Sequence, residues 1–576
     1  MPYDLGHGLL VQRPWRKAWA KHVVEGADEL LEPRPLFELI SKTAAASPSR
    51  RCLRFQGAGM SYGQVDDLSS RFASVLLALG AKKGDRVALF LPNMPQFIAA
   101  YFGTLKAGGI VVPCSPLYKT RELEFQLRDS GSSFLVAAND VVKGNDLFAS
   151  VEGCRYKLDI KVITASLTDY LPGAKRALAG LAGVKNEKRT KIVGAFRDLV
   201  SKSPPLSKNA EIDPRRDVAV LQYTGGTTGV AKGAMLTHSN LYMNAAVTAR
   251  WFPLKGDDIA LGALPFFHIY GMTAAMNAPL SAGGSIVLLP RFEVDTVMKV
   301  IQDEKITSFC GVPTMYIAVI NHPNVAKFSL RTVRGCISGG AALPRAVSEG
   351  FARITGGTLV EGYGLSESSP VTHCNPMGEG AAPRDGSIGV PVPFTDAKVV
   401  DMGDSSKELP VGEAGELAVK GPQVMLGYWN NVAETENVFT EDGWLLTGDI
   451  AKMDPDGYFY IVDRKKDMID VSGLKVYPRE VEELLFNCPG VKEAAVVGMP
   501  DSYRGEAVHA YIVLKPESKG KVSEDDVIRF CRSNLSTYKA PRKVTFVDEL
   551  PKSLVGKVLR RKLRETDASA EQAPAS

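Results

Sequence analysis

One short stretch of the sequence combines residue types that suit the binding of an anion. The segment YTGGTTGVAKGAMLTH, from Tyr223 to His238, contains four glycines, four threonines and one lysine. Glycine lets the backbone reach positive φ and lets a ligand approach the backbone N–H groups, while hydroxyl and ammonium groups supply further hydrogen-bond donors. The stretch favours a phosphate-binding loop, although a hairpin turn with a chance cluster of threonines fits the same residues when they are taken alone.

The residues around this stretch narrow the kind of phosphate loop. The apolar run VAVLQY ends directly in TGGTTG, so the loop lies at the carboxyl end of an expected strand, where α/β sheets bind ligands. In the P-loop of nucleoside triphosphatases the lysine follows the last glycine and a helix comes next, whereas here Lys232 precedes Gly233 and the strand-like run AMLTH follows. The dinucleotide fingerprint GxGxxG, with an acidic residue about 20 positions later, is not found either. Both of these nucleotide-binding classes are therefore disfavoured.

Length and composition set the broad class of the protein. A chain of 576 residues exceeds what one compact core holds, so two or more lobes are expected. The 69 Lys and Arg residues nearly balance the 64 Asp and Glu residues, and the resulting charge of +5 argues against a nucleic-acid partner. Eight cysteines without a CxxC pair and seven histidines without HExxH spacing predict neither disulfides nor a transition-metal site, and His373 is interpreted as structural. A reducing compartment fits best.

No segment has the pattern of a targeting signal or a membrane span. The first residues lack the charged-then-apolar order and the small-residue cleavage site of a secretion signal. The most apolar stretch, residues 97–114, is interrupted by Lys106, Gly108, Gly109 and Pro113, so it falls short of the ~18 clean apolar residues that a span needs. We expect a soluble or peripheral protein of the cytoplasm.

The apolar pattern predicts an α/β protein. Up to about residue 160, helical patterns such as residues 62–80 alternate with short apolar runs, among them RVALFLP, IVVPC and SFLVAA. The alternation resumes in DVAVLQY, GSIVLLP, SFCGVP and VRGCISGGA, and later becomes strand-rich in DAKVVD, GELAVKG and GYFYIVD. These runs predict a large N-terminal domain over residues 1–465, made of layered α/β subdomains and a strand-rich subdomain.

The C-terminal part of the chain has a pattern of its own. Pro478 suits the first turn of a helix with an apolar face, and Ser523 opens a second helix with a capping box. The runs EAAVVGM, AVHAYIVLK and KVTFVDEL predict strands. We expect a small, mobile α+β domain over residues 466–566, followed by a disordered tail at 567–576.

A basic segment separates the first α/β region from the second. Residues 171–208 contain nine Lys or Arg residues and two acidic residues, and they are interpreted as an insertion. Such a composition is typical of a solvated surface helix with a linker; the alternative is a basic amphipathic segment that rests on an anionic membrane.

Further stretches share the density of glycine, hydroxyl and charge. They are SGGAAL (338–343), EGYGLSESSP (361–370), TGDI (447–450), DRKKDMIDVSGLKVYPREVEE (463–483) and PKSLVGKVLRRKLR (551–564). In this order and spacing the motifs resemble the adenylate-forming enzymes: acyl-CoA synthetases, aryl-CoA ligases, luciferases and peptide-synthetase adenylation domains. The resemblance covers roughly residues 35–566. The run LPFFHIYGM and the basic segment make the chain look most similar to long-chain fatty acid and coumarate-type CoA ligases.

The resemblance implies a nucleotide site for ATP and Mg²⁺. It assigns the β- and γ-phosphates to the loop residues Thr224, Gly225, Gly226, Thr227, Thr228, Gly229 and Lys232, and it assigns Mg²⁺ to Thr224 and Glu367. It assigns further contacts with ATP and AMP to Gly339, Gly340, Ala341, Glu361, Gly362, Tyr363, Gly364, Ser366, Asp449 and Arg464, with Arg464 at the ribose or the α-phosphate. Within this set Tyr363 stacks on adenine, worth ~1–3 kcal/mol in comparable settings, and Asp449 accepts from the ribose hydroxyls. Lys557 bridges the attacking carboxylate and the α-phosphate, where its charge stabilises the transition state.

The resemblance also implies a second half-reaction with coenzyme A. No carrier domain follows Lys557, so a free thiol is indicated. Lys466 is then the hinge of a small-domain motion that places the loop around Gly473 beside a pantetheine tunnel. Glycine at position 364, where short-chain relatives carry tryptophan, implies room for a longer or aromatic acid, and His268 either borders that pocket or is a core histidine.

Two residues depart from the family pattern. Ala231 replaces a proline, which can cost ~0.4–1 kcal/mol of loop ordering, and Ser366 replaces threonine while keeping the hydroxyl.

The expected function is that of an ATP- and Mg²⁺-dependent acid:CoA ligase acting on medium- to long-chain fatty acids, with release of AMP and pyrophosphate. The alternatives are an aryl-acid CoA ligase and a non-catalytic nucleotide-binding relative. The expected partners are the acid, ATP and CoA, with peripheral membrane contact through residues 171–208 and a homodimer as further expectations.

Overall fold

The structure is a computed structural model that divides into two compact units. It describes residues 13–20, 23, 27–142, 145–154, 158–178, 184–186, 192–224, 231–378, 380–472, 474–501, 503–552 and 558–571. The larger unit comprises residues 1–396 and 420–443, and the smaller unit comprises residues 397–419 and 444–576. Each unit is described by itself.

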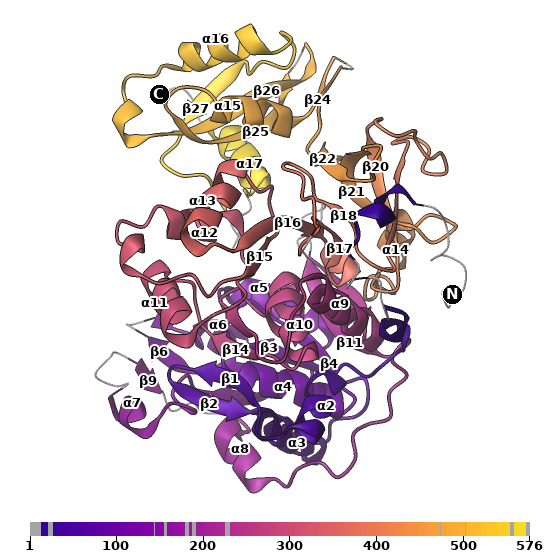
Figure 1. Cartoon of the computed structure of the whole chain (residues 1–576), viewed down its shortest axis with the longest axis vertical. Coiled ribbons are helices and arrows are strands. Elements are labelled where there is room, and N and C mark those ends of the chain that lie inside the picture. Colours follow the sequence, from indigo (N-terminus) through magenta and orange to yellow (C-terminus); the bar gives the residue numbers. More distant parts are fainter. Residues whose placement is uncertain are drawn as a thin grey trace. The chain divides into compact units, whose positions relative to one another are not determined.

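The larger unit contains a sheet of seven strands (Figure 1). Their order is β10 (Gly194–Ala195), β8 (Lys161–Ala165), β5 (Phe134–Ala138), β3 (Arg86–Phe90), β4 (Ile110–Pro113), β11 (Val218–Thr224) and β12 (Lys232–Thr237). Neighbouring strands from β10 to β11 are parallel, and β12 pairs with β11 in the antiparallel sense. Every residue of β5 is buried, as expected for a parallel strand covered on both faces.

The described part of this unit also contains three smaller sheets. One has the order β13 (Ile259–Gly262), β14 (Ser285–Leu288), β1 (Arg51–Phe55) and β2 (Ala58–Ser61). Another has the order β15 (Gly335–Ser338), β16 (Thr358–Gly364), β17 (Val371–Cys374) and β18 (Val390–Pro391). The third is formed by β7 (Asn145–Asp146), β6 (Asp140–Val142) and β9 (Val184–Asn186). The predicted strand in SFCGVP is wrong, because Ser308 and Gly311 form only isolated bridges.

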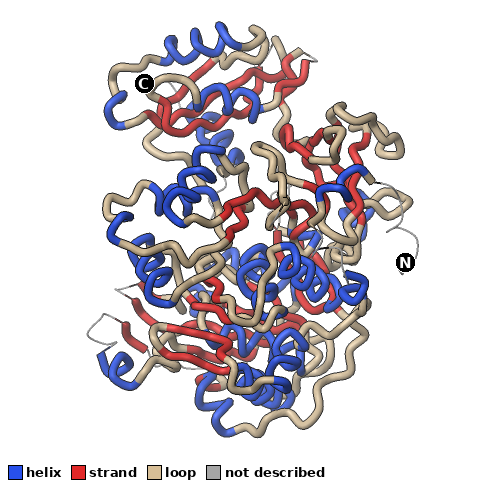
Figure 2. The backbone as a smooth tube through the Cα atoms, viewed as in Figure 1, coloured by secondary structure: helices blue, strands red, loops and turns tan. Residues whose placement is uncertain are grey.

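Along the chain, helices alternate with many of these strands; Figure 2 shows the helices in blue and the strands in red. The α-helices are α2 (Glu38–Ala46), α3 (Tyr62–Ala78), α4 (Pro95–Lys106), α5 (Thr120–Ser130), α6 (Ala149–Cys154), α7 (Gly173–Leu178), α8 (Phe196–Lys202), α9 (His238–Trp251), α10 (Ala278–Ser281), α11 (Val294–Glu304), α12 (Pro313–Ile320), α13 (Arg345–Thr355) and α14 (Val432–Val438). Short 3-10 turns are η2 (Pro14–Ala18), η3 (Ala27–Leu31), η6 (Val325–Lys327) and η7 (Ser366–Ser368), and η5 (Gly271–Asn277) is a π-helix.

The most apolar stretch of the sequence is a core helix followed by a core strand. All residues of α4 are buried, including Lys106, whose ammonium donates to Asp66 at 2.7 Å and to Ser70 at 2.9 Å. Burial lowers the pKa of Lys106, and the carboxylate of Asp66 opposes that shift. Among the described residues, no helix has the length and apolar content that crossing a membrane requires.

Part of the basic segment belongs to the core. β10 extends the seven-stranded sheet by pairing with β8, and α8 buries Phe196, which stacks on Phe72 with ring centroids 5.0 Å apart. Phe196 and Val200 face the protein interior, whereas Asp198, Ser201 and Lys202 are exposed, so α8 is a surface helix with one buried apolar face. The interpretation of residues 171–208 as an insertion stays a prediction.

The smaller unit contains two sheets and three α-helices in its described part (Figure 1). One sheet has the order β19 (Asp396–Val400), β20 (Gly415–Lys420), β21 (Leu445–Met453) and β22 (Phe459–Arg464). The other has the order β24 (Leu474–Val476), β23 (Ile469–Val471), β26 (Gly505–Leu514) and β25 (Val491–Asp501), with β27 (Lys543–Phe546) paired to β26. The helices are α15 (Pro478–Phe486), α16 (Glu524–Asn534) and α17 (Arg560–Glu571), and η8 (Pro516–Ser518) is a short turn.

The signals read from the C-terminal sequence are confirmed. Pro478 occupies the first turn of α15, and Ser523 forms a capping box with Asp526 at the start of α16. Val481 and Leu485 of α15 lie in an apolar core with residues of β25 and β26. The mixed α/β fold class is likewise confirmed, while the domain boundary between residues 465 and 466 stays a prediction.

Candidate functional site

The glycine- and threonine-rich loop is closed by a β-hairpin. β11 ends at Thr224 and β12 begins at Lys232, and these two residues are partners in the antiparallel register. The hairpin places Thr224 and Lys232 beside each other at the end of the seven-stranded sheet. The predicted loop residues between them, Gly225, Gly226, Thr227, Thr228 and Gly229, lie outside the described residues.

The ammonium group of Lys232 lies in a small cluster of charged and aromatic groups. It forms an ion pair with the carboxylate of Glu434, and it lies 5.0 Å from the ring centroid of Tyr428. The Lys232 side chain is only 9% exposed. A cation that keeps such partners is oriented before any ligand arrives, because the ring and the carboxylate restrict its rotamers.

Tyr428 also contacts the predicted metal ligand. Its hydroxyl donates to Oε1 of Glu367 at 2.7 Å. Burial and the nearby carboxylates of Glu367 and Glu434 raise the pKa of Tyr428, so the phenol stays protonated and remains a donor. One aromatic side chain thus links the cation of the loop to the carboxylate at position 367.

Residues 425–434 form a strap that places Tyr428 and Glu434 next to the hairpin. Its backbone bonds to β12 through Met235 N to Gly427 O (2.9 Å) and Trp429 N to Gly233 O (2.8 Å). It bonds to η7 through Met425 N to Glu367 O (2.8 Å). Because the strap is fixed to both elements, the positions of all four charged or aromatic groups depend on one another.

A second cluster gathers the residues predicted to hold the nucleoside. β15 and β16 are parallel and pair Ser338 with Glu361, so the SGGAAL loop starts where the EGYG run lies. Oε2 of the buried Glu361 accepts from Leu343 N at 2.8 Å and closes that loop onto the strand. Gly340 has φ +80°, and a Cβ on Gly339 would lie 3.0 Å from the ring of Tyr270. Gly339 is buried, while Gly340 and Ala341 are exposed at the loop.

Tyr363 and the neighbouring glycines lie on β16. The ring of Tyr363 is half-buried and meets His373 of β17 edge to face, with centroids 5.9 Å apart. His373 is buried, as the structural interpretation expects, and burial lowers its pKa to about 3. Gly362 faces Ile337, where a Cβ would approach within 2.8 Å.

Gly364 has a local reason to be glycine. A Cβ at this position would lie 2.0 Å from the carbonyl oxygen of Pro370, which is backbone and cannot turn away. Tryptophan at this position would therefore first disturb the β16–β17 connection. The acyl-pocket assignment of Gly364 stays a prediction, and the residue type alone does not support it.

Ser366 and Glu367 lie together in η7, which contacts both strands of the hairpin. His268, the other predicted pocket residue, is half-buried and ends a turn just before the π-helix η5; its Nδ1 accepts from Tyr270 N at 3.2 Å. π-helical turns are frequent at functional sites. This placement keeps both interpretations of His268 open.

The smaller unit holds Asp449 and Arg464 side by side. They are partners in the β21–β22 register, and Arg464 Nε lies 3.4 Å from Asp449 Oδ1. Glu416 supports the turn, because it accepts from Gly448 N at 3.1 Å and from Lys465 Nζ at 2.7 Å. A carboxylate next to a guanidinium suits a ligand that carries both hydroxyl groups and a phosphate.

Lys466 lies in the turn that follows β22. Partial burial and the nearby Arg464 lower its pKa. The next residue, Asp467, is buried and pairs with Arg560 at 3.2 Å and Arg564 at 3.5 Å, while Arg560 makes two hydrogen bonds of 2.8 Å to Glu482. The turn is thus tied to α17. Lys557 and Gly473 lie outside the described residues.

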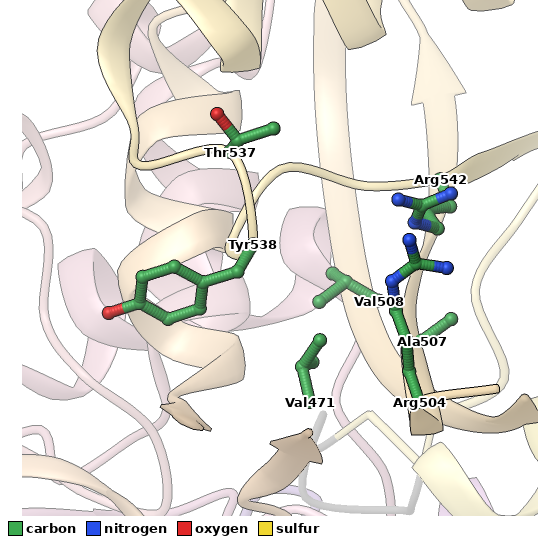
Figure 3. A pocket seen from close by; sticks show the side chains of 7 residues that line it. All are labelled: Val471, Arg504, Ala507, Val508, Thr537, Tyr538 and Arg542. Carbon is green, nitrogen blue, oxygen red and sulfur yellow. The ribbon is translucent and has the colours of Figure 1, made fainter. Parts of the chain in front are cut away.

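The smaller unit also has a pocket of about 220 Å³. It is lined by Val471, Arg504, Ala507, Val508, Thr537, Tyr538 and Arg542. In Figure 3 the guanidinium groups of Arg504 and Arg542 lie beside one another, with Tyr538 on the opposite side of the pocket. Two adjacent guanidinium groups repel each other, so the arrangement suits a phosphate-bearing ligand.

The structure adds residues that the sequence reasoning missed. Tyr428, Glu434 and Glu416 were not predicted, although the run GYWNNVAE joins an aromatic and an acidic residue directly after a strand-rich stretch. Across the part of the chain that the structure describes, no group of three or more His, Cys, Asp or Glu side chains forms a metal site. A metal held by few protein ligands and by substrate phosphates, as is usual for Mg²⁺, needs no such group.

Known proteins resemble the chain along almost its whole length. The AMP-binding enzyme family matches residues 40–429, and the AMP-binding enzyme C-terminal domain matches residues 480–557. A long-chain-fatty-acid–CoA ligase of Bacillus subtilis (strain 168) is 42% identical over 564 residues, covering 96% of this chain and 98% of that protein. The enzyme of the same name from Escherichia coli O6:H1 is 39% identical over 566 residues, with the same coverage.

Solved structures show the same fold. ATP-bound MatB from Rhodopseudomonas palustris is 31% identical with a TM-score of 0.82, covering 93% of this chain and 99% of that one. The anthranilate CoA ligase AuaEII in complex with anthranoyl-AMP is 27% identical with a TM-score of 0.82, covering 95% and 100%. The resemblance to adenylate-forming enzymes is confirmed, and the chain belongs to the AMP-binding enzyme family.

Proposed function

We propose that the protein is an ATP- and Mg²⁺-dependent acid:CoA ligase that acts on medium- to long-chain fatty acids. The observation that carries the proposal is the similarity, over 96% of the chain, to ligases named for long-chain fatty acids. The cluster of Lys232, Tyr428 and Glu367 at the hairpin supports it, because a cation and a carboxylate next to Thr224 are what a nucleotide polyphosphate and its metal require.

The first half-reaction brings two anions together. A carboxylate oxygen of the acid forms a bond to the α-phosphorus of ATP, the bond from that phosphorus to the bridging oxygen breaks, and pyrophosphate leaves. Lys232 offers its ammonium to the departing phosphates, while Lys557 is assigned to the α-phosphate and the attacking carboxylate. The oxygens of Glu367 and Thr224 suit Mg²⁺, which supplies positive charge to the phosphates when bound.

The second half-reaction transfers the acyl group. The sulfur of CoA attacks the acyl carbon, AMP leaves with its phosphate oxygen, and the thiol proton goes to solvent. Asp449 and Arg464 are proposed to hold the ribose and the α-phosphate of the adenylate, since they form adjacent partners on β21 and β22. Lys466 is proposed as the hinge of the small-domain motion that separates the two half-reactions, since it lies in the turn directly after β22.

The phosphates of CoA fit the pocket of the smaller unit. Arg504 and Arg542 supply the only charged groups of its lining among the described residues. Arg542→Gln is expected to raise the KM for CoA severalfold and to leave pyrophosphate release without CoA unchanged, because only the thiol substrate carries phosphates to this pocket. An unchanged KM for CoA would remove the pocket from the proposal.

A panel of acids tests the function. Pyrophosphate release is measured with and without CoA for acetate, octanoate, palmitate, benzoate and coumarate. Faster turnover of octanoate or palmitate than of the other acids, with acyl-CoA as product, supports the proposal. Preference for benzoate or coumarate would favour the aryl-acid ligase, and absence of pyrophosphate release with every acid would favour a non-catalytic relative.

Membrane contact through residues 171–208 belongs to the same proposal, as do a cytoplasmic location and a homodimer. The basic residues of this segment are the ones proposed to meet anionic lipid, at ~1 kcal/mol for each residue near the surface. Salt-sensitive binding to phosphatidylserine vesicles tests the contact, cell fractionation tests the location, and light scattering tests the dimer.

A further inference from the structure

The loop lysine already has an anionic partner within its own unit. The carboxylate of Glu434 pairs with the ammonium of Lys232, whose side chain is 9% exposed, against 29% for Glu434. A lysine in contact with a carboxylate presents little net charge to a third group. A polyphosphate that binds Lys232 must therefore compete with Glu434 for the same ammonium group.

Glu434 is held in this place by its surroundings. It lies in the first turn of α14, and its N–H donates to the side chain of Asn431 at 3.2 Å. Thr435 next to it accepts from Tyr428 N at 2.8 Å, which fixes the turn to the strap. These hydrogen bonds hold the backbone around Glu434, and its carboxylate pairs with Lys232.

The two carboxylates of the cluster differ in what they can do. Glu367 accepts from Tyr428 through Oε1 and suits a divalent cation that accompanies the phosphates. Glu434 lies directly on the lysine, so it is the nearer source of repulsion for phosphates that contact Lys232. Its effect on a bound anion has the opposite sign to that of the lysine.

We propose that Glu434 is a displaceable counter-ion of Lys232. It pairs with the lysine in the nucleotide-free protein, yields the ammonium to the β- and γ-phosphates of ATP, and pairs again when pyrophosphate leaves. Glu434 is a positioning residue in this scheme, since it acts through Lys232. It weakens the binding of ATP and pyrophosphate and speeds the release of pyrophosphate; the inference rests on the proposed function.

The test compares Glu434→Gln with Glu436→Gln in the full chain. Both changes remove one negative charge from α14, and Glu436 is exposed. The probe is inorganic pyrophosphate with Mg²⁺, titrated by calorimetry, together with the KM for ATP and kcat. A carboxylate and one phosphate charge about 8 Å apart, at an effective dielectric constant of about 40, repel each other enough to change Kd about fivefold.

Glu434→Gln is expected to lower the Kd for pyrophosphate and the KM for ATP about fivefold or more, and to lower kcat where pyrophosphate release limits turnover. Glu434→Asp keeps the charge and is expected to return both constants toward the wild-type values, while Glu436→Gln leaves them unchanged. An unchanged or higher Kd for pyrophosphate in Glu434→Gln would overturn the proposal.

Two further outcomes are separable. If neither Glu434→Gln nor Glu434→Ala folds, as judged by circular dichroism, the ion pair is structural and the proposal is wrong. Acyl-CoA formation by the wild-type protein reports on the proposed function itself. An active wild type with unchanged pyrophosphate affinity in Glu434→Gln defeats only the counter-ion role.

Discussion

Tyr428→Phe removes one hydroxyl group and keeps the aromatic ring next to Lys232. The lost group is the donor in the 2.7 Å hydrogen bond to Oε1 of Glu367. Hydrogen bonds to charged groups contribute about 1.5–3 kcal/mol, and because Glu367 is half-exposed we take the lower end, about 1.5 kcal/mol. That free energy corresponds to about a tenfold change in an equilibrium constant.

The change is expected to appear in the response to Mg²⁺. Partners that orient a metal ligand typically affect metal affinity by about 10–100-fold, so the Mg²⁺ concentration for half-maximal pyrophosphate release should rise about tenfold in Tyr428→Phe. The assay is a Mg²⁺ titration at saturating ATP and fatty acid. Tyr242→Phe, on a half-buried tyrosine of α9, is the matched control and should leave the titration unchanged.

An unchanged Mg²⁺ titration in Tyr428→Phe would refute the reasoning, because it would mean that Glu367 does not hold the metal or that its orientation does not depend on Tyr428. Tyr428→Leu separates the two roles of the side chain. It removes the ring as well, so it should also weaken the binding of pyrophosphate if the ring helps to orient Lys232.

Lys557→Ala should abolish adenylate formation and spare thioester formation from a supplied acyl-adenylate, and equal loss of both steps would contradict the assigned role. Lys466→Pro fixes φ near −65° in the turn after β22, so it should keep single-turnover pyrophosphate release and lower acyl-CoA formation by orders of magnitude; normal acyl-CoA output would exclude the hinge. Burial raises the pKa of Asp463 to about 6. The folded protein therefore keeps a proton that the unfolded chain releases near pH 4, and this stabilisation, complete below about pH 4, is lost as the pH rises through 6. Between pH 4 and 7 the free energy of unfolding of the wild type should fall by about 3 kcal/mol relative to Asp463→Asn, and parallel pH profiles in urea denaturation would contradict it.

The elements that position the site could be predicted from local signals. β11, β3 and β5 coincide with short apolar runs, and α15 and α16 begin where proline and a capping box predict them. Such signals depend only on neighbouring residues in the sequence, so a single sequence is enough to detect them. The SFCGVP run shows the limit of this approach, because an apolar run also fits a buried connection that forms single bridges.

The chemistry of the hairpin was predicted only in part. Thr224, Lys232 and Glu367 carry recognisable motif positions, whereas Glu434 lies 202 residues after Lys232 and reaches it through the strap. No periodicity or spacing rule connects residues so far apart. For Gly364, the sequence resemblance suggests a role in the acyl pocket. The structure gives another reason for glycine, because a Cβ here would collide with the backbone carbonyl of Pro370.

β12 is the last strand of the seven-stranded sheet, and its outer edge is occupied by the strap. Gly233 O, Met235 N and Met235 O all bond to strap residues. An uncovered edge of this kind is a template for pairing with the strand of another molecule, and so for aggregation. The segment that brings Tyr428 and Glu434 to the hairpin therefore also blocks strand pairing at this edge, so that substitutions which loosen the strap are expected to lower solubility together with activity.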